Sequence, residues 1–207
     1  MSKLITLVGA LFALVMVTGL GNGAETANAA GCRLVYVDWV RAFEVDTSRL
    51  GGGRDVGPNF IGRFGTMELD RNRDGLPDKW TDDGGGGVWR VKRPHFQGQH
   101  SLRLSGCLAG GNGAARMFRF KVEPSSPVRI YMKMLPTRFA TANPNGCIRV
   151  SEIYSDLGNN FFRRFSQSYA LSDFVGGRWS NVIRLSPNPG AVFLSLRIEH
   201  DLTCPEL

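Results

Sequence analysis

The chain has 207 residues, four cysteines and a formal net charge of +7 at pH 7. This length suits one domain with a sizeable core. The positive charge favours acidic partners, such as anionic glycans or a cell envelope, unless it serves solubility alone. The sequence contains no RNA-binding motif, zinc finger or recognition-helix pattern, so no nucleic-acid partner is predicted.

The N-terminus is predicted to be a cleaved signal peptide covering residues 1–29. Lys3 supplies the positive start, residues 4–20 form an apolar run, and residues 27–29 read Ala-Asn-Ala, a small-x-small cleavage pattern. We therefore expect a secreted protein, extracellular or in the cell envelope, with no membrane span in the mature chain. A lipoprotein is the minor alternative, because Cys32 follows small residues soon after the cleavage site.

The cysteines bear on both redox environment and metal binding. Their positions are Cys32, Cys107, Cys147 and Cys204. An even number in an exported chain predicts two disulfides, and three connectivities are possible. Wide, irregular spacing disfavours zinc, whose cysteine ligands usually occur as close pairs.

Short alternating runs separated by glycine and proline predict an all-β protein. The predicted strands cover residues 34–45, 88–91, 101–108, 117–122, 128–135, 148–154, 161–169, 181–185 and 192–199. Residues 50–65 are a Gly-rich connection without a strong pattern, expected to be a loop or linker. This set of strands fits two packed antiparallel sheets, a β-sandwich.

The segment after this connection resembles a calcium-binding loop. Oxygen-bearing side chains stand at relative positions 1, 3, 5 and 9, and a glycine at position 6 permits a sharp turn. The predicted ligands are Asp70, Asn72, Asp74, Asp78 and the backbone carbonyl of Leu76 at position 7. Position 12 is threonine instead of the glutamate of an EF-hand, so we expect a structural Ca²⁺ ion on a β scaffold. The alternative is an uncomplexed acidic turn.

From residue 67 onward, the order of features resembles a carbohydrate-binding-module-like jelly roll of the galactose-binding type. The matching segments are 67–70 (Met-Glu-Leu-Asp), 74–80 (Asp-Gly-Leu-Pro-Asp-Lys-Trp), 98–104, 150–158, Trp179 and the 189–191 turn. The resemblance implies a single jelly-roll domain over residues 30–207 that binds carbohydrate without cleaving it. It also implies Glu68 as a further calcium ligand.

One departure concerns the last strand of such domains, which usually carries an Asp pair followed by Val. The chain ends without it, whereas residues 35–41 (Val-Tyr-Val-Asp-Trp-Val-Arg) resemble it. We hypothesise a circular permutation in which residues 34–45 are the displaced terminal strand. The hypothesis predicts Cys32–Cys204 and Cys107–Cys147 disulfides, and a Cys32–Cys107 disulfide would contradict it. The alternative is a surface structural or adhesion subunit, in which this strand completes the sheet of a neighbouring copy by donor-strand exchange.

Strand alternation also predicts a binding face, because successive side chains point to opposite faces. One sheet face is expected to carry a ring of cations around Tyr131, with Trp89 as a second aromatic contact for a sugar ring. The predicted cations are Arg119, Arg129, Lys133, Arg149 and Arg197. Arginine binds carboxylates and sulfates in a bidentate manner, so the predicted partner is an acidic polysaccharide.

Catalytic motifs are weak. The three histidines are scattered, and no nucleophile elbow or metalloprotease helix is present. Glu152 and Glu199 lie on predicted strands and are the one candidate carboxylate pair for glycoside cleavage, but ion-pair roles are the better interpretation. We therefore predict that the protein is not an enzyme.

Overall fold

The computed structural model describes residues 32–48, 53–84, 87–107, 111–124, 126–158 and 160–204. The predicted signal peptide lies outside these residues. Within them, no helix is long and apolar enough to cross a membrane.

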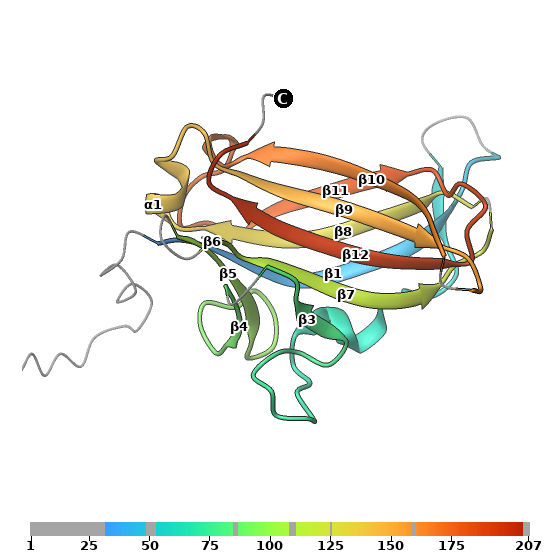
Figure 1. Ribbon diagram of the computed structural model, residues 1–207, viewed down its shortest axis with the longest axis horizontal. Coiled ribbons are helices and arrows are strands. Elements are labelled where there is room, and N and C mark those ends of the chain that lie inside the picture. The colour runs from blue at the N-terminus through green and yellow to red at the C-terminus, as the bar shows by residue number, and fades with distance from the viewer. Residues whose placement is uncertain are drawn as a thin grey trace, which may run out of the picture.

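Two antiparallel sheets pack face to face as a β-sandwich, and Figure 1 looks through both layers. One sheet runs in the order β11-β8-β1-β5-β4, with β2 paired to β1 and β6 paired to β5. Its strands are β1 (Arg33–Asp46), β2 (Arg54–Val56), β4 (Val88–Val91), β5 (Ser101–Cys107), β6 (Gly111–Asn112), β8 (Val128–Pro136) and β11 (Ser180–Ser186). We call it the seven-stranded sheet.

The second, five-stranded sheet runs in the order β10-β9-β12-β7-β3. Its strands are β3 (Trp80–Asp82), β7 (Ala114–Lys121), β9 (Cys147–Ser155), β10 (Phe161–Ala170) and β12 (Phe193–Asp201). The helical elements are short: η2 (Gly62–Thr66), α1 (Arg138–Thr141) and η3 (Leu171–Asp173). All nine predicted strands are confirmed, each within a few residues of its predicted bounds.

The core lies between the sheets and follows the predicted alternation. On β8, Val128, Ile130 and Met132 are buried in the core. On β12, Leu194, Leu196 and Ile198 are buried in the same way. Burying aliphatic side chains stabilises the fold by about 25 cal/mol for each Å² of apolar surface removed from water. The opposite residues of these strands therefore form the two outer faces.

Strand β1 lies in the middle of its sheet. Its first half pairs with β5, its second half with β2, and its other edge with β8. Over most of its length the strand is thus paired on both edges within its own chain.

The predicted disulfide pairing is wrong: the bridges are Cys32–Cys107 and Cys147–Cys204. The reason is strand register. Arg33 pairs with Gly106, which places Cys32 next to Cys107 within the seven-stranded sheet. The other bridge closes the five-stranded sheet, where β9 begins opposite the end of β12. Each bridge joins strands of one sheet, whereas a Cys32–Cys204 bridge would cross between layers, so the permutation hypothesis fails the test set for it.

The connection at residues 50–65 is also more ordered than predicted. Residues 50–52 lie outside the described residues, but β2 and η2 occupy much of the rest. Asn59 accepts hydrogen bonds from the amides of Ala42 and Ile61, at 3.0 and 3.2 Å, and so fixes the segment to β1. Gly65 packs so closely on β1 that an added Cβ would lie 1.8 Å from the carbonyl oxygen of Val40. The segment is therefore part of the packed domain and not a linker.

An ion pair crosses the core between the two sheets. Arg184 of β11 donates to the Glu152 carboxylate of β9, and its other side donates to the Gln167 side chain of β10 at 2.7 Å. Glu152 is fully buried, and this burial raises the pKa of its carboxyl despite the neighbouring guanidinium. A buried charge of this kind is tolerated only while its partner is present.

We predict that Arg184→Met lowers the free energy of unfolding by about 3–5 kcal/mol at pH 8, because Glu152 is left as an uncompensated buried charge. The raised pKa of Glu152 gives the sign of the pH dependence. The folded Arg184→Met variant tolerates the neutral Glu152 carboxyl. Its free energy of unfolding is therefore retained near pH 4.5 and falls as the pH rises through the raised pKa of Glu152. Urea unfolding at pH 5 and pH 8 measures this. A deficit that is equal at both pH values would contradict the prediction.

The matched control is the double variant Glu152→Gln and Arg184→Met. This double variant contains no titratable group at the site. Its free energy of unfolding should therefore lack the additional loss between pH 5 and pH 8 that is expected for Arg184→Met.

Candidate functional site

The structure divides the predicted basic face between two surfaces. Arg129, Tyr131 and Lys133 lie on β8 and face outward from the seven-stranded sheet. Arg119, Arg149 and Arg197 belong to the five-stranded sheet. The prediction of a single cationic ring around Tyr131 is therefore wrong. Alternation along a strand gives the side of the sheet that a residue occupies, but it does not say to which sheet the strand belongs.

Several of the predicted ligand residues are engaged by acidic side chains. Arg129 and Tyr131 both bind Asp55 of β2, at 2.6 and 2.5 Å. Arg197 donates to Asp83 at 2.7 Å and to Glu199 at 2.5 Å. These guanidinium groups are already neutralised.

Arg149 lies in the same charged row of the five-stranded sheet. Its guanidinium nitrogens are 3.8 Å from Glu199 and 3.5 Å from Asp201. Trp89 of β4 is 40% exposed, and its ring is covered by the Arg103 guanidinium at 4.5 Å. Neither residue lies beside Arg119, so the predicted set does not form one site.

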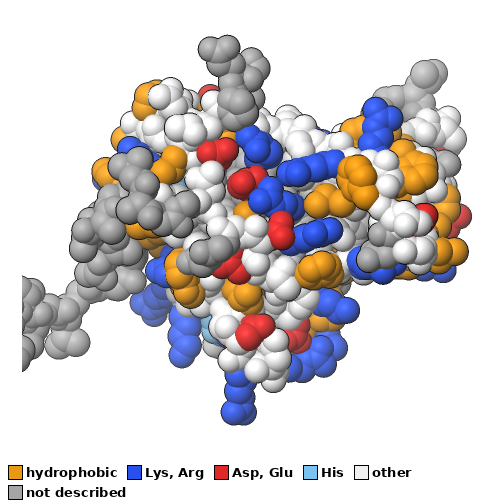
Figure 2. All heavy atoms as spheres, in the orientation of Figure 1, with side chains coloured by type: hydrophobic (Ala, Val, Ile, Leu, Met, Phe, Trp, Pro, Cys, Tyr) orange, Lys and Arg blue, Asp and Glu red, His pale blue; other side chains and the backbone are white. Residues whose placement is uncertain are grey.

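A pocket of about 260 Å³ lies on the outer face of the five-stranded sheet. Its lining consists of Arg116, Phe118, Arg119, Ile153, Ser155, Phe161 and Ser195, contributed by β7, β9, β10 and β12. Figure 2 shows basic and apolar side chains side by side on this face, over β9 and β12. Of the predicted ligand residues, Arg119 lines this pocket. We call it the sheet pocket.

A β-bulge in β7 produces the sheet pocket. Phe120 pairs with Leu194 and Met117 with Leu196, so two residues of β7 oppose the single residue Ser195 of β12. Arg119 adopts a positive φ of 31°, and its amide donates to the Ser195 hydroxyl at 3.3 Å. The bulge turns Phe118 outward, whereas regular alternation predicts it in the core.

The pocket combines exposed rings with cations. Phe118 is 39% exposed and Phe161, at the start of β10, is 67% exposed. The Arg116 guanidinium lies 5.2 Å from the Phe118 ring centroid, and that of Arg119 lies 4.1 Å from the ring of Phe193. Neither arginine forms a salt bridge to any residue that the structure describes. The pKa of Asp156 is lowered mainly by hydrogen bonds from Asn160 and also by the charge of Arg119, so Arg119 has an acidic neighbour at longer range. Neither guanidinium is held in an ion pair with a described residue, so both can contact an anionic ligand.

The predicted calcium loop lies beside β3 and β4, beyond the long strands (Figure 1). Gly75 has a φ of 84°, as the sharp turn requires. Both oxygens of Asp78 accept from Arg71, at 2.8 and 2.6 Å. Asp74 accepts from the Asn72 amide and from the backbone N–H of Leu76, at 2.7 and 2.8 Å.

The loop oxygens fit a cation only in part. Among the described residues, no three Asp, Glu, His or Cys side chains are grouped so that they could hold a metal ion. One oxygen, Oδ1 of Asp70, is buried without a hydrogen-bond partner. The other oxygen of Asp70 lies 4.0 Å from the Arg90 guanidinium. Calcium binding therefore requires Asp78 to exchange its arginine for the ion.

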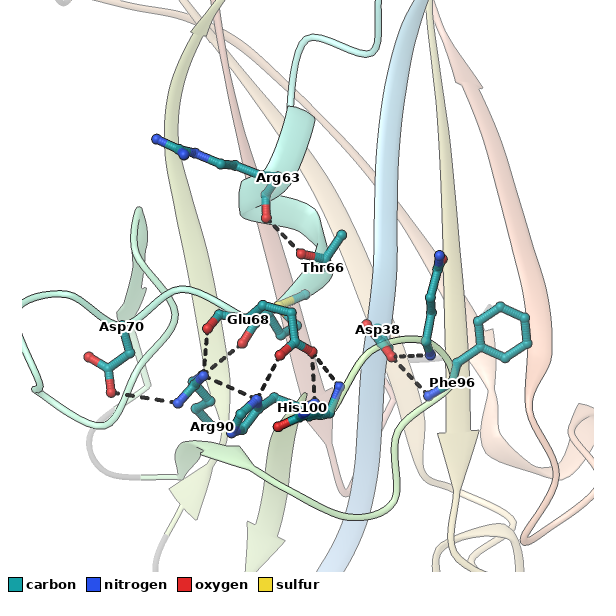
Figure 3. Close-up of polar contacts among 11 residues, drawn as sticks. Asp38, Arg63, Thr66, Glu68, Asp70, Arg90, Phe96 and His100 are labelled. Carbon is teal, nitrogen blue, oxygen red and sulfur yellow. Dashed lines mark hydrogen bonds and ion pairs between the residues drawn. The ribbon is translucent and has the colours of Figure 1, made fainter.

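Glu68, the ligand implied by the resemblance, has a different role in the structure (Figure 3). One oxygen accepts from the amides of Gln99 and His100, at 2.7 and 2.9 Å, and the other contacts His100 Nδ1 at 2.9 Å. Arg90 donates to the carbonyls of Met67 and Glu68 and so closes this network. Glu68 thus anchors the loop that precedes β5.

Asp38 anchors the same loop from the other side (Figure 3). It is fully buried and accepts from the amides of Trp39, Phe96 and Gln97, at 2.6, 2.8 and 3.0 Å. Burial raises the pKa of Asp38, although these three donors favour its charged form. This role of Asp38 was not predicted, since nothing in the sequence pairs it with residues 96 and 97.

The candidate carboxylate pair for catalysis is separated by the five-stranded sheet. Glu152 lies on the inner face and pairs with Arg184. Glu199 lies on the outer face and pairs with Arg197 and Arg149. Two carboxyl groups on opposite faces of a sheet cannot flank one glycosidic bond.

No family model matches the chain, and no curated protein matches it. Two solved structures share part of the fold. The enzymatically active domain of tailspike protein 4 from bacteriophage CBA120 has a TM-score of 0.44 at 14% identity, and the match covers 60% of this chain but 17% of that one. TmCBM61, solved in complex with β-1,4-galactotriose, has a TM-score of 0.26 at 14% identity, covering 60% of this chain and 78% of that one. At these TM-scores neither likeness bears on the ligand.

We predict that Asp38→Asn releases the loop that carries Phe96. An asparagine offers one oxygen acceptor where the carboxylate offers two, and its NH₂ group faces backbone N–H donors. Leaving buried donors unsatisfied should lower the free energy of unfolding by about 1–3 kcal/mol. Hydrogen exchange should show faster exchange of the Phe96 and Gln97 amides. Asp46→Asn, an exposed acceptor at the end of β1, is the matched control and should leave these amides protected.

Proposed function

We propose that this protein is a secreted, non-catalytic carbohydrate-binding domain, and that its sheet pocket binds polysaccharides bearing carboxylate or sulfate groups. The observation that carries the proposal is that one pocket of about 260 Å³ contains exposed rings together with arginines that form no salt bridge to a described residue. The two disulfides support an oxidising, extracellular location.

The rings support sugar stacking. The C–H face of a pyranose packs on an aromatic face, and Phe161 and Phe118 present such faces to solvent. Ser155 and Ser195 line the same pocket and supply hydroxyl groups for hydrogen bonds to the sugar.

The arginines support an acidic ligand. Arg116 and Arg119 form no salt bridge with any described acid, in contrast to Arg149 and Arg197 of the same sheet. The Nε atom of Arg116 is also buried without a hydrogen-bond acceptor. A ligand carboxylate or sulfate would supply the missing acceptor through a charge-assisted hydrogen bond.

The test is binding of a short galacturonate oligomer, measured by calorimetry. Phe161→Ala and Arg119→Gln should each weaken affinity about tenfold, equivalent to about 1.4 kcal/mol. Binding by the wild type should weaken as salt is raised, because the arginine contacts are exposed and screened. Arg54→Gln is the matched control, since it removes one exposed positive charge on β2, away from the pocket. Equal binding of neutral glucans without salt dependence would contradict the acidic preference.

We further propose that calcium stabilises the loop at residues 70–78. The 1, 3, 5 and 9 spacing, the turn at Gly75 and the unpartnered Oδ1 of Asp70 support this. Asp70, Asn72, Asp74 and the Leu76 carbonyl would hold the ion, with Asp78 joining them on release from Arg71.

We predict that calcium raises the melting temperature and that a chelator reverses the rise. At about 100 times the dissociation constant, the ion should add about 2.7 kcal/mol to the free energy of unfolding. Asp70→Asn should abolish the calcium-dependent rise. Asp173→Asn, which changes an acidic residue in η3 far along the chain, should retain it. A melting temperature that is indifferent to calcium would contradict the proposal.

A further inference from the structure

The outer face of the seven-stranded sheet carries a row of aromatic rings that the sheet pocket does not use. Trp39 of β1 and Phe96 of the loop before β5 meet edge to face, with ring centroids 6.2 Å apart. Phe96 meets Trp179 in the same way at 6.1 Å. The central ring, Phe96, is 42% exposed. We call these three residues the aromatic row.

Two cations lie against the rings of this row. The Arg41 guanidinium is 4.0 Å from the Trp39 ring centroid, and the Lys133 ammonium is 4.2 Å from that of Phe96. Neither cation forms a salt bridge within the described part of the chain. A guanidinium stacked flat on an indole keeps its N–H edge free for an anion. The aromatic row therefore combines aromatic rings with cations that form no salt bridge to a described residue, as the sheet pocket does.

Two features that oppose folding hold the aromatic row in place. Trp39 has a φ of 54°, a left-handed conformation that a bulky residue rarely adopts. It lies in a bulge, where the register of β1 and β8 shifts between Asp38 and Arg41. The second feature is the fully buried carboxylate of Asp38, which accepts from the Trp39 amide and from the Phe96 amide. Figure 3 shows the bond to Phe96.

Together these features fix the positions of two neighbouring rings. Strained backbone and buried charge both oppose folding, and outliers of this kind cluster at ligand-binding sites. Trp179 packs against a second buried cluster of Leu34, Tyr36 and Leu135. Core packing does not account for the positions of Trp39 and Phe96, which belong to neither hydrophobic cluster, and the Phe96 ring is open to solvent.

We propose that the aromatic row is a second glycan-binding surface, for chains that carry carboxylate or sulfate groups, and that one molecule thereby joins two polysaccharide chains. The proposal rests on the proposed function of the sheet pocket. The two surfaces lie on opposite outer faces of the sandwich. Because stacked sheets are about 10 Å apart before their outer side chains are counted, one short oligosaccharide cannot occupy both surfaces.

The first experiment counts binding sites with hexagalacturonate by calorimetry. The wild type should bind two oligomers per chain. Phe96→Ala and Phe161→Ala should each bind one, and the double variant should bind none. Arg41→Gln, which leaves the rings in place, should weaken the second site about tenfold, as loss of one charge-assisted contact predicts. Phe139→Ala removes a ring of similar exposure (45%) from α1 and should retain both sites.

The second experiment measures cross-linking by light scattering with polygalacturonate. The wild type should form large particles, whereas Phe96→Ala and Phe161→Ala should bind the polymer without joining chains. Scattering by the protein alone reports self-association, and a concentration-dependent rise without polymer would overturn the two-surface explanation.

The outcomes separate this proposal from the proposed function. One site that is lost in Phe161→Ala but unaffected by Phe96→Ala and Arg41→Gln overturns the second surface and leaves the sheet pocket intact. One site that is lost in Phe96→Ala but retained in Phe161→Ala overturns the sheet pocket. An absence of any binding overturns both.

Discussion

The pleat of two antiparallel sheets fixes which side chains reach solvent, and both candidate binding surfaces lie where that alternation is interrupted. The bulge in β7 turns Phe118 outward and gives Arg119 a positive φ. The bulge in β1 does the same for Trp39, next to the buried Asp38. In a regular strand, one of any two successive side chains points into the core. In β7 the bulge places the successive residues Phe118 and Arg119 on the outer face, and in β1 it turns Trp39 outward while Val40 stays in the core.

Charge pairing decides which of the many arginines can serve a ligand. Arg129, Arg149 and Arg197 have nearby carboxylates, so their charges mainly hold strands together. The stacked arginines, Arg41 and Arg119, have aromatic neighbours instead. A ring attracts the cation but does not neutralise it, so the field of the guanidinium still extends into solvent.

The sequence predicted the strands well because their alternation is strong and their turns are marked by glycine and proline. It predicted the two-sheet fold for the same reason. It placed Arg129 and Arg119 on one face because alternation contains no information on which strands become neighbours. The disulfides were mispaired for a related reason: Cys32 meets Cys107 through the register of β1 and β5, a contact between distant segments. The residues at each bulge did not predict it either, since a bulge depends on the register between two paired strands.

The loop at residues 67–78 and the loop that carries Phe96 form one hydrogen-bonded unit, and this limits what the acidic residues can do. Glu68 accepts from the amides of Gln99 and His100, so a cation that drew its carboxylate away would release the anchor of the Phe96 loop. Arg90 binds the first loop through the carbonyls of Met67 and Glu68, and its guanidinium lies 3.1 Å from His100 Nδ1 at the end of the second. The proposed calcium ligands do not include Glu68, so an ion held by them would leave the hydrogen bonds of Glu68 to Gln99 and His100 in place. The proposed ion and the anchor of the Phe96 loop would therefore use different carboxylates.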